Sequence, residues 1–284
     1  MTRIVYLNGE YLPADEAKVS IFDRGLLFGD AIYEVAGVLD GKLIDFSGHM
    51  RRLWRSLGEL SLPQTLSEDE ILAAYRHLVE ANNIREGLVY MQITRGEAER
   101  AFEWIGETTP TILMFAQEKL SLDNKKAKTG VKLKSVEDIR WARRDIKTVN
   151  LLGQVLAKQA ATEAGAYEAL MIDTDGFVTE CSATSFFFIK NNTIVTRPLS
   201  NDILPGVTRR SLISLSKEYE LAMDERLFTL DEVYEADEAF ITGASTYVLP
   251  VVMVDDRSIG TGQCGPLATR LREIYVAYIR ETAI

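Results

Sequence analysis

Tight turns between short β-type segments constrain the fold of this chain most strongly. Four dipeptides mark them: Asn8-Gly9, Asp40-Gly41, Asp175-Gly176 and Asn191-Asn192. Asn, Asp and Gly accept the positive φ angles of two-residue hairpin turns, and the flanking residues are mostly apolar or β-branched. We therefore expect antiparallel hairpins along the chain.

Helical patterns interrupt the expected strands. Leucines recur at helical spacing from His49 to about Leu60, and Ser67–Asn82 opens with the capping box Ser67-x-x-Glu70. The other expected helices are Leu151–Ala160, Thr208–Leu221, Thr229–Tyr234 and Pro266–Ile279, and further strands are Leu88–Arg95, Thr111–Ala116 and Val131–Val136. Because strands and helices do not alternate regularly, we expect an α+β fold in two layers.

A chain of 284 residues suits two domains of ordinary size. The polar stretch over 118–124 and the basic KKAKTG after it have no apolar periodicity, so the boundary is expected there. We predict an N-terminal α/β domain over 1–118, a linker over 119–125 and a C-terminal domain over 126–284.

Charge and composition exclude several classes of function. A net charge of −10 argues against binding to nucleic acid, and no apolar run is long enough to span a membrane. Cys181 and Cys264 are too few and too far apart to predict a disulfide framework, and His49 and His77 do not predict a catalytic metal centre. A cytoplasmic location is expected, with no metal, nucleic acid or membrane as a partner.

Lys147 stands in a short half-apolar segment between Ile146 and Val149. An amine beside apolar residues loses hydration, which favours its neutral, nucleophilic form. Such an amine can form a Schiff base with a carbonyl cofactor. A single lysine is more often a solvated residue, so the rest of the chain must decide. The helix after it is expected to be amphipathic, with an apolar side formed by Leu151, Leu152, Val155, Leu156 and Ala160.

Glu180 ends the β-type segment FVTE, directly before the apolar CSATSFFFI. A carboxylate beside so apolar a segment must be paired or exposed to water. A protonated pyridine nitrogen is one suitable partner, and an edge-strand glutamate facing solvent is the alternative.

Three further features suit a phosphate. Leu204–Arg210 opens a helix after Gly206, where the amides of Val207 and Thr208 favour an anion. The small-residue turn over 242–246 offers more backbone donors, and the Arg52 guanidinium suits bidentate contact. Each feature alone is weak, but together with Lys147 and Glu180 they match what a phosphopyridine aldehyde requires.

In seven ordered segments the chain resembles the fold type IV pyridoxal-phosphate enzymes, and most closely the bacterial D-amino-acid transaminases. These segments are DRGLLFGDAIYEV, HMRRLWRS, YMQITRG, EDIRWARRDIKTVNLLGQVLAKQ, VTECSATSFF, LPGVTRR and YVLPV. The resemblance implies a two-domain architecture in which 126–284 is the cofactor-binding domain, with pyridoxal 5′-phosphate at the domain interface.

Roles follow from the resemblance residue by residue. It implies that Lys147 forms the Schiff base and moves the proton between the substrate Cα and the cofactor C4′. It also implies that Glu180 pairs with the pyridine nitrogen. The residues expected to hold the phosphate are Arg52, Val207, Thr208, Ala244 and Ser245, with Ala244 standing where the family commonly has threonine.

On the substrate side, the resemblance places Tyr33, Val35 and Arg100 in the site. Phe102 stands where D-amino-acid transaminases have a carboxylate-binding histidine. We hypothesise that this change admits more apolar substrates, including (R)-primary amines. Arg100 would reach the partner subunit's site in a homodimer, and a 2-oxoacid such as 2-oxoglutarate or pyruvate would accept the nitrogen.

Three alternatives stay open from the sequence. A branched-chain L-amino-acid aminotransferase shares the lysine, glutamate and phosphate pattern, and an aminodeoxychorismate lyase shares the arrangement in KTVNLL. A non-catalytic binding protein is the third alternative. The joint presence of Lys147, Glu180 and Arg52 argues against it.

Overall fold

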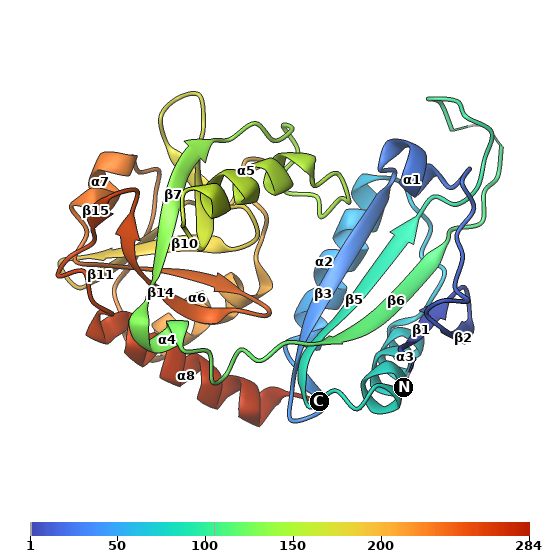
Figure 1. Ribbon diagram of the computed structural model, residues 1–284, viewed down its shortest axis with the longest axis horizontal. Helices are drawn as coiled ribbons and strands as arrows, with labels where there is room; N and C mark the ends of the chain where they lie inside the picture. The colour runs from blue at the N-terminus through green and yellow to red at the C-terminus, as the bar shows by residue number, and fades with distance from the viewer. Residues whose placement is uncertain (1, 105) are drawn as a thin grey trace. The chain divides into compact units, whose positions relative to one another are not determined.

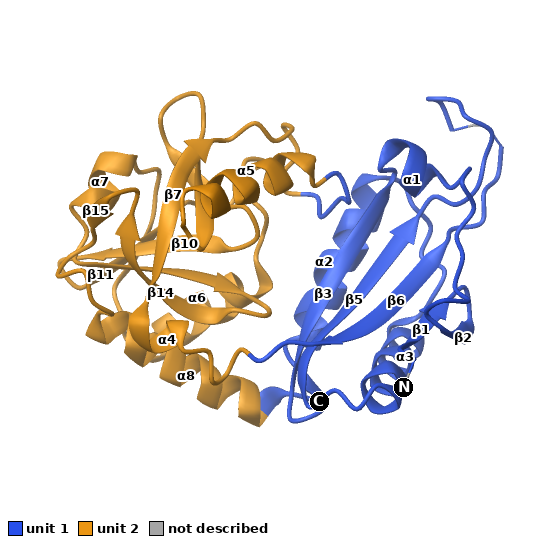
Figure 2. Ribbon diagram, viewed as in Figure 1, with its two compact units in different colours: residues 1–120, 146–150, 282–284 blue, residues 121–145, 151–281 orange. Residues whose placement is uncertain are grey.

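The computed structural model describes residues 2–104 and 106–284 (Figure 1). The chain forms two units, each with its own sheet and core. Unit 1 comprises residues 1–120, 146–150 and 282–284, and unit 2 comprises residues 121–145 and 151–281 (Figure 2).

A six-stranded antiparallel sheet forms the base of unit 1, in the order β2-β1-β6-β5-β3-β4. Its strands are β1 Ile4–Leu7, β2 Glu10–Pro13, β3 Ala31–Leu39, β4 Lys42–Leu43, β5 Glu86–Thr94 and β6 Ile112–Glu118. The helices are α1 Arg24–Phe28, α2 Phe46–Glu59 and α3 Glu68–Ala81. Asn8 and Asp40 have φ angles of 51° and 53° at the predicted turns, which confirms both hairpins.

One face of this sheet packs on the helices and forms the core of unit 1. Ile32 and Met91 from the strands lie in one apolar cluster with Met50 and Leu53 of α2. Side chains alternate between the two faces of a strand. The other face of this sheet therefore carries half-buried side chains that stand next to the core residues in sequence: Tyr33, Val35, Tyr90 and Phe115. The capping box of α3 is present, because Glu70 N–H donates to Ser67 Oγ and Ser67 N–H donates to Glu70 Oε2.

Unit 2 contains a nine-stranded mixed sheet, in the order β12-β11-β10-β13-β14-β7-β8-β9 with β15 paired to β14. Its strands are β7 Val131–Glu137, β8 Glu168–Ile172, β9 Val178–Cys181, β10 Ser185–Lys190, β11 Thr193–Thr196, β12 Met223–Glu225, β13 Glu238–Gly243, β14 Tyr247–Val254 and β15 Arg257–Ser258. The helices are α4 Lys126–Thr129, α5 Leu152–Glu163, α6 Val207–Glu218, α7 Leu230–Tyr234 and α8 Pro266–Thr282. The α+β class is confirmed.

The predicted helix after the lysine segment is present as α5, but its apolar side is not the side that packs in unit 2. Leu152, Val155 and Leu156 are exposed by 70%, 57% and 51%. The buried face of α5 carries Ala157 and Ala161, which cluster with other small or flexible side chains of unit 2. Alanine lets the helix approach β7 and β8 closely, and periodicity alone does not identify which face does so.

The predicted second domain over 126–284 is interrupted. Residues 146–150 and 282–284 belong to unit 1, and the change of unit after β6 falls between residues 120 and 121. Ile146 is a member of the unit 1 core, and Ile284 pairs with Leu43 through two backbone hydrogen bonds. Within the described ranges no helix is long and apolar enough to cross a membrane.

Candidate functional site

Lys147 lies on an extended segment beside β3. Its carbonyl accepts from Tyr33 N–H at 2.9 Å, and Thr148 forms an antiparallel bridge with Ile32. The buried Ile146 anchors the segment, because its side chain belongs to the unit 1 core. Lys147 Nζ stands 4.1 Å from the centre of the Tyr33 ring. The amine is thus half-buried against an aromatic face, not placed on a freely solvated helix start.

An aromatic row on the same sheet face begins at Tyr33, the ring beside Lys147. The Tyr33 ring stacks on Tyr90 at 5.5 Å, and Tyr90 stacks on Phe115 at 4.9 Å. Val35 is the register partner of Tyr90 and shares this face. Burial, with the nearby Tyr33, raises the pKa of Tyr90 to about 12, so its hydroxyl stays neutral. It donates to Gln92 Oε1 at 2.9 Å. This face therefore presents stacked aromatic rings and tyrosine hydroxyl groups beside the Lys147 amine.

Arg52 lies on α2 and is bound by Glu34 of β3. Its Nε and Nη2 donate to the two carboxylate oxygens of Glu34 at 2.7 and 2.8 Å, and His49 Nδ1 lies 2.8 Å from Oε2. Burial would raise the pKa of Glu34, but Arg52 and His49 hold it well below its ordinary value. Burial lowers the pKa of His49 in spite of Glu34. The pair fixes the plane of the guanidinium, as recognition of an anion requires.

Arg100 and Phe102 lie together on the loop between β5 and β6. The Arg100 guanidinium stands 5.7 Å from the Phe102 ring and 5.5 Å from the Phe28 ring, and the Phe102 side chain is 79% exposed. The loop therefore presents one cation beside one apolar ring.

In unit 2, Glu180 is buried at the end of β9. Its Oε1 accepts from Arg140 Nη1 at 2.6 Å and from Leu204 N–H at 3.1 Å, while Oε2 has no hydrogen bond within the ranges that the structure describes. Burial raises the pKa of the Glu180 carboxyl, and Arg140 opposes that shift. One carboxylate oxygen thus stays available to a cationic ring nitrogen.

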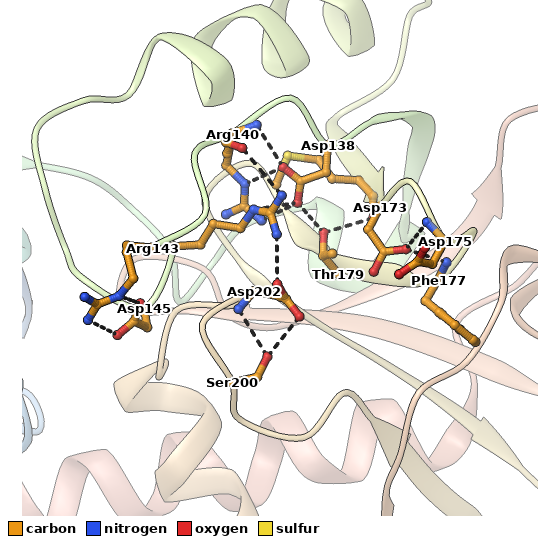
Figure 3. Close-up of polar contacts among 12 residues, drawn as sticks. Asp138, Arg140, Arg143, Asp145, Asp173, Asp175, Phe177, Thr179, Ser200 and Asp202 are labelled. Atoms are coloured by element: carbon orange, nitrogen blue, oxygen red, sulfur yellow. Dashed lines mark hydrogen bonds and ion pairs between the residues drawn. The ribbon is translucent and has the colours of Figure 1, made fainter.

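Hydrogen bonds with Asp138 hold Arg140 in place, and Thr179 lies beside them (Figure 3). Arg140 Nε and Nη2 donate to the two oxygens of Asp138 at 2.9 and 2.8 Å, and Thr179 Oγ1 donates to Asp138 Oδ2 at 2.7 Å. Burial would raise the pKa of Asp138, but the hydrogen bonds from Arg140 and Thr179 keep it lowered. Asp138 therefore balances the charge of Arg140, which leaves Glu180 only partly compensated.

The start of α6 forms a place for an anion. Gly206 is the N-cap residue and contributes no side chain, so the first amides, those of Val207 and Thr208 among them, point out of a twelve-residue helix. A Cβ at position 206 would lie 2.7 Å from Ser185 Oγ, so only glycine leaves this space open. Thr242, the register partner of Ser185, has a buried Oγ1 without a hydrogen-bond partner in the described part of the chain. An orphaned hydroxyl beside free helix amides fits a phosphate.

Ala244 and Ser245 lie in the turn that joins β13 to β14. The turn is closed by Thr246 N–H, which donates to Gly243 O at 3.0 Å. Ser245 O accepts from Ser121 Oγ at 2.7 Å, which fixes the turn from the side. Ala244 has no side-chain donor, so its contribution to an anion site is its amide.

The structure brings Lys147 together with Tyr33, and Arg100 together with Phe102. Sequence reasoning gave no role to Arg140, Glu34 or Tyr90, although the motifs EDIRWARRDIK, DAIYEV and YMQITRG contain them. Their position within those motifs is the signal that was available.

Comparisons with known proteins add to this geometry. The family model described as "Amino-transferase class IV" matches residues 31–254. The chain belongs to the class IV aminotransferase family. It is 38% identical over 283 residues to a D-alanine aminotransferase of Staphylococcus aureus, covering 99% of both chains. It is 37% identical over 268 residues to a D-alanine aminotransferase of Bacillus licheniformis, covering 94% of both. The crystal structure of a branched-chain amino acid aminotransferase from Thermobaculum terrenum, in its PLP form, has a TM-score of 0.86 and 25% identity, covering 99% of this chain and 94% of that one.

Family membership confirms the prediction of an aminotransferase with small-molecule amino donors and oxoacid acceptors.

Proposed function

We propose that this protein is a pyridoxal-phosphate-dependent transaminase that moves the amino group of D-alanine-like D-amino acids to a 2-oxoacid such as 2-oxoglutarate or pyruvate. The observation that carries the proposal is the identity of 37–38% with D-alanine aminotransferases along nearly the whole chain. The half-buried Lys147 amine on the Tyr33 ring agrees with it.

The residues present fit pyridoxal phosphate. The open start of α6, with the orphaned Thr242 hydroxyl and the turn carrying Ala244 and Ser245, suits the phosphate. The cofactor supplies a carbonyl that takes up nitrogen and an electron-poor ring that stabilises charge at the substrate Cα. We propose that Val207, Thr208, Ala244, Ser245 and Arg52 hold the phosphate.

Glu180 and Lys147 have the two chemical roles in this proposal. The unbonded Oε2 of Glu180 binds the pyridine N–H, and burial strengthens that charge-assisted hydrogen bond. The Lys147 amine holds the cofactor and then moves a proton between the substrate Cα and the cofactor C4′.

Substrate recognition is assigned to Tyr33, Val35, Arg100 and Phe102. Arg100 pairs with the substrate carboxylate, and Tyr33 offers its ring and hydroxyl beside Lys147. The exposed ring of Phe102 adds apolar surface where a histidine would donate a hydrogen bond. We propose that (R)-primary amines are accepted as side substrates for this reason.

We further propose a cytoplasmic homodimer in which Arg100 of one chain serves the site of the partner. The resemblance to the D-amino-acid transaminases supports it, together with the exposed apolar side chains of α5, Leu152, Val155 and Leu156. Light scattering during size-exclusion chromatography gives the mass, and a particle of one chain's mass, 31.8 kDa, would contradict it.

The test of the function is a product assay with the purified, cofactor-loaded protein. With D-alanine and 2-oxoglutarate, we expect pyruvate and glutamate in equal amounts, and chiral chromatography should show D-glutamate. Lys147→Ala should abolish turnover, whereas Lys158→Ala, a change of the same kind on α5, should retain it. Absence of both pyruvate and glutamate, in protein that has taken up the cofactor, would contradict the proposal.

A branched-chain L-amino-acid aminotransferase is the second candidate, because the Thermobaculum terrenum structure is so similar. L-leucine as donor distinguishes it. Faster turnover with L-leucine than with D-alanine would favour this candidate.

A further inference from the structure

Arg24 on α1 is almost completely buried, with 3% of its surface exposed, yet it lies next to a loop of largely exposed residues. Its Nη1 donates to Ala101 O at 2.7 Å and to Glu103 O at 3.4 Å, and its Nη2 donates to Phe102 O at 3.2 Å. One guanidinium thus binds three consecutive carbonyls on the loop that carries Arg100 and Phe102.

Asp30 connects this contact to the far side of the loop. Its Oδ2 accepts from Arg24 Nε at 3.0 Å, from Arg95 Nε at 2.8 Å and from Trp104 Nε1 at 3.2 Å. Burial would raise the pKa of Asp30, but the hydrogen bonds from Arg95 and Arg24 keep it lowered. The Arg95 guanidinium also lies 3.8 Å from the centre of the Trp104 ring. Both the middle of the loop and Trp104 are therefore tied to one carboxylate.

Local structure places Arg24 for this contact. Asp23 caps α1 by accepting from Gly25 N–H at 2.7 Å, and Thr94 Oγ1 donates to the other oxygen of Asp23 at 2.9 Å. Arg24 N–H donates to Gly96 O at 2.9 Å, so α1 is fixed to the point where the loop leaves β5. The Phe28 ring contacts both the Arg24 and the Arg100 guanidinium, at 4.7 and 5.5 Å.

We propose that Arg24 is a positioning residue for substrate recognition: by holding the carbonyls of residues 101–103 it sets Arg100 and Phe102 for the substrate carboxylate. The inference rests on the proposed function, because it takes Arg100 as the carboxylate partner. Only a guanidinium has donors in a planar fork that reach an aspartate and three carbonyls together; a lysine ammonium cannot span them.

The test substitutes Arg24→Lys, which keeps the charge and removes the fork. In cofactor-loaded protein, D-alanine is titrated while the visible band of the bound cofactor is followed, which gives the apparent Kd and the limiting rate. We expect the apparent Kd to rise roughly tenfold and the limiting rate to change less than about threefold, because ground-state binding of the carboxylate is lost. Arg85→Lys is the matched control: Arg85 is 81% exposed with one long ion pair, and neither value should change.

Hydrogen–deuterium exchange in the absence of substrate supplies a readout that does not depend on activity. Arg24→Lys should accelerate exchange in residues 97–104 and leave the peptide around Lys147 and the cofactor spectrum unchanged. If exchange in the loop is the same in Arg24→Lys as in the wild type, the proposal is overturned. It is also overturned if Arg24→Lys lowers the limiting rate by the same factor as it raises the apparent Kd.

If Arg24→Lys does not fold, Trp104→Phe removes another donor to Asp30 from an exposed side chain. It should shift the Kd in the same direction by a smaller factor, and an unchanged Kd overturns the proposal. If wild-type protein does not respond to D-alanine, the proposed function fails. The exchange experiment then still decides whether Arg24 orders the loop.

Discussion

The buried ion pair of Glu34 and Arg52 yields the sharpest stability prediction. Glu34 is completely buried and accepts three hydrogen bonds at 2.7–2.8 Å, two from Arg52 and one from His49. Glu34→Gln keeps the shape of the side chain but removes its charge. It also replaces one carboxylate oxygen with an NH2 group, which then faces an N–H donor of Arg52 or His49. Arg52, 8% exposed, then keeps a charge without its carboxylate. Removing one partner of a buried pair costs about 3–5 kcal/mol, and we expect a loss in that range.

The assay is urea unfolding of the cofactor-free protein, followed by circular dichroism and tryptophan fluorescence. Asp40→Asn is the control, because Asp40 and Arg85 form an exposed pair at 3.6 Å and asparagine accepts the φ angle of 53°. That change should cost less than about 0.5 kcal/mol. The double variant with Arg52→Met should be more stable than Glu34→Gln, since no uncompensated charge remains. A loss below about 1 kcal/mol for Glu34→Gln, at an unchanged urea dependence, would refute the reasoning.

Three further predictions concern separate parts of the chain. Gly206→Ala should weaken cofactor binding about tenfold, because the new Cβ would lie 2.7 Å from Ser185 Oγ. Titration of the apoprotein with pyridoxal phosphate measures this. Gly58→Ala is the control and should leave cofactor binding unchanged, because a Cβ at position 58 has no neighbouring atom within 4 Å. Phe102→His should raise the rate ratio of D-alanine to an (R)-arylamine roughly tenfold, through one charge-assisted hydrogen bond, and an unchanged ratio would reject the role of Phe102. Burial would raise the pKa of Asp255, but hydrogen bonds from Lys134 and Ser135 lower it to about 2. The stabilisation that the Asp255 carboxylate contributes is therefore present above pH 4 and is lost as the pH falls towards 2. Asp255→Asn should therefore cost roughly 1 kcal/mol at pH 7 and little at pH 2, and an equal cost at both would contradict the assignment.

Local signals predicted the local structure. The hairpin at Asn8-Gly9 and the capping box at Ser67 depend on residues within a few positions, so the sequence contains their whole cause. The α+β class follows from the sum of such elements, and the resemblance predicted the family.

Long-range pairing could not be predicted from these patterns. The five residues that include Lys147 join unit 1 because Ile146 enters its core, and no periodicity shows that. The apolar residues Leu152, Val155 and Leu156 of α5 are exposed, and the smaller Ala157 and Ala161 are buried instead, which the apolar periodicity does not show. Arg24 binds carbonyls 77 to 79 positions away, and a carbonyl is the same in every residue, so no residue type marks the contact.

The central claim is tested most directly by mixing the cofactor-loaded protein with D-alanine and, separately, with L-alanine while the visible spectrum is recorded. We predict that D-alanine alone removes the visible band of the bound cofactor and that 2-oxoglutarate restores it. Loss of the band with L-alanine or L-leucine, but not with D-alanine, would contradict the account.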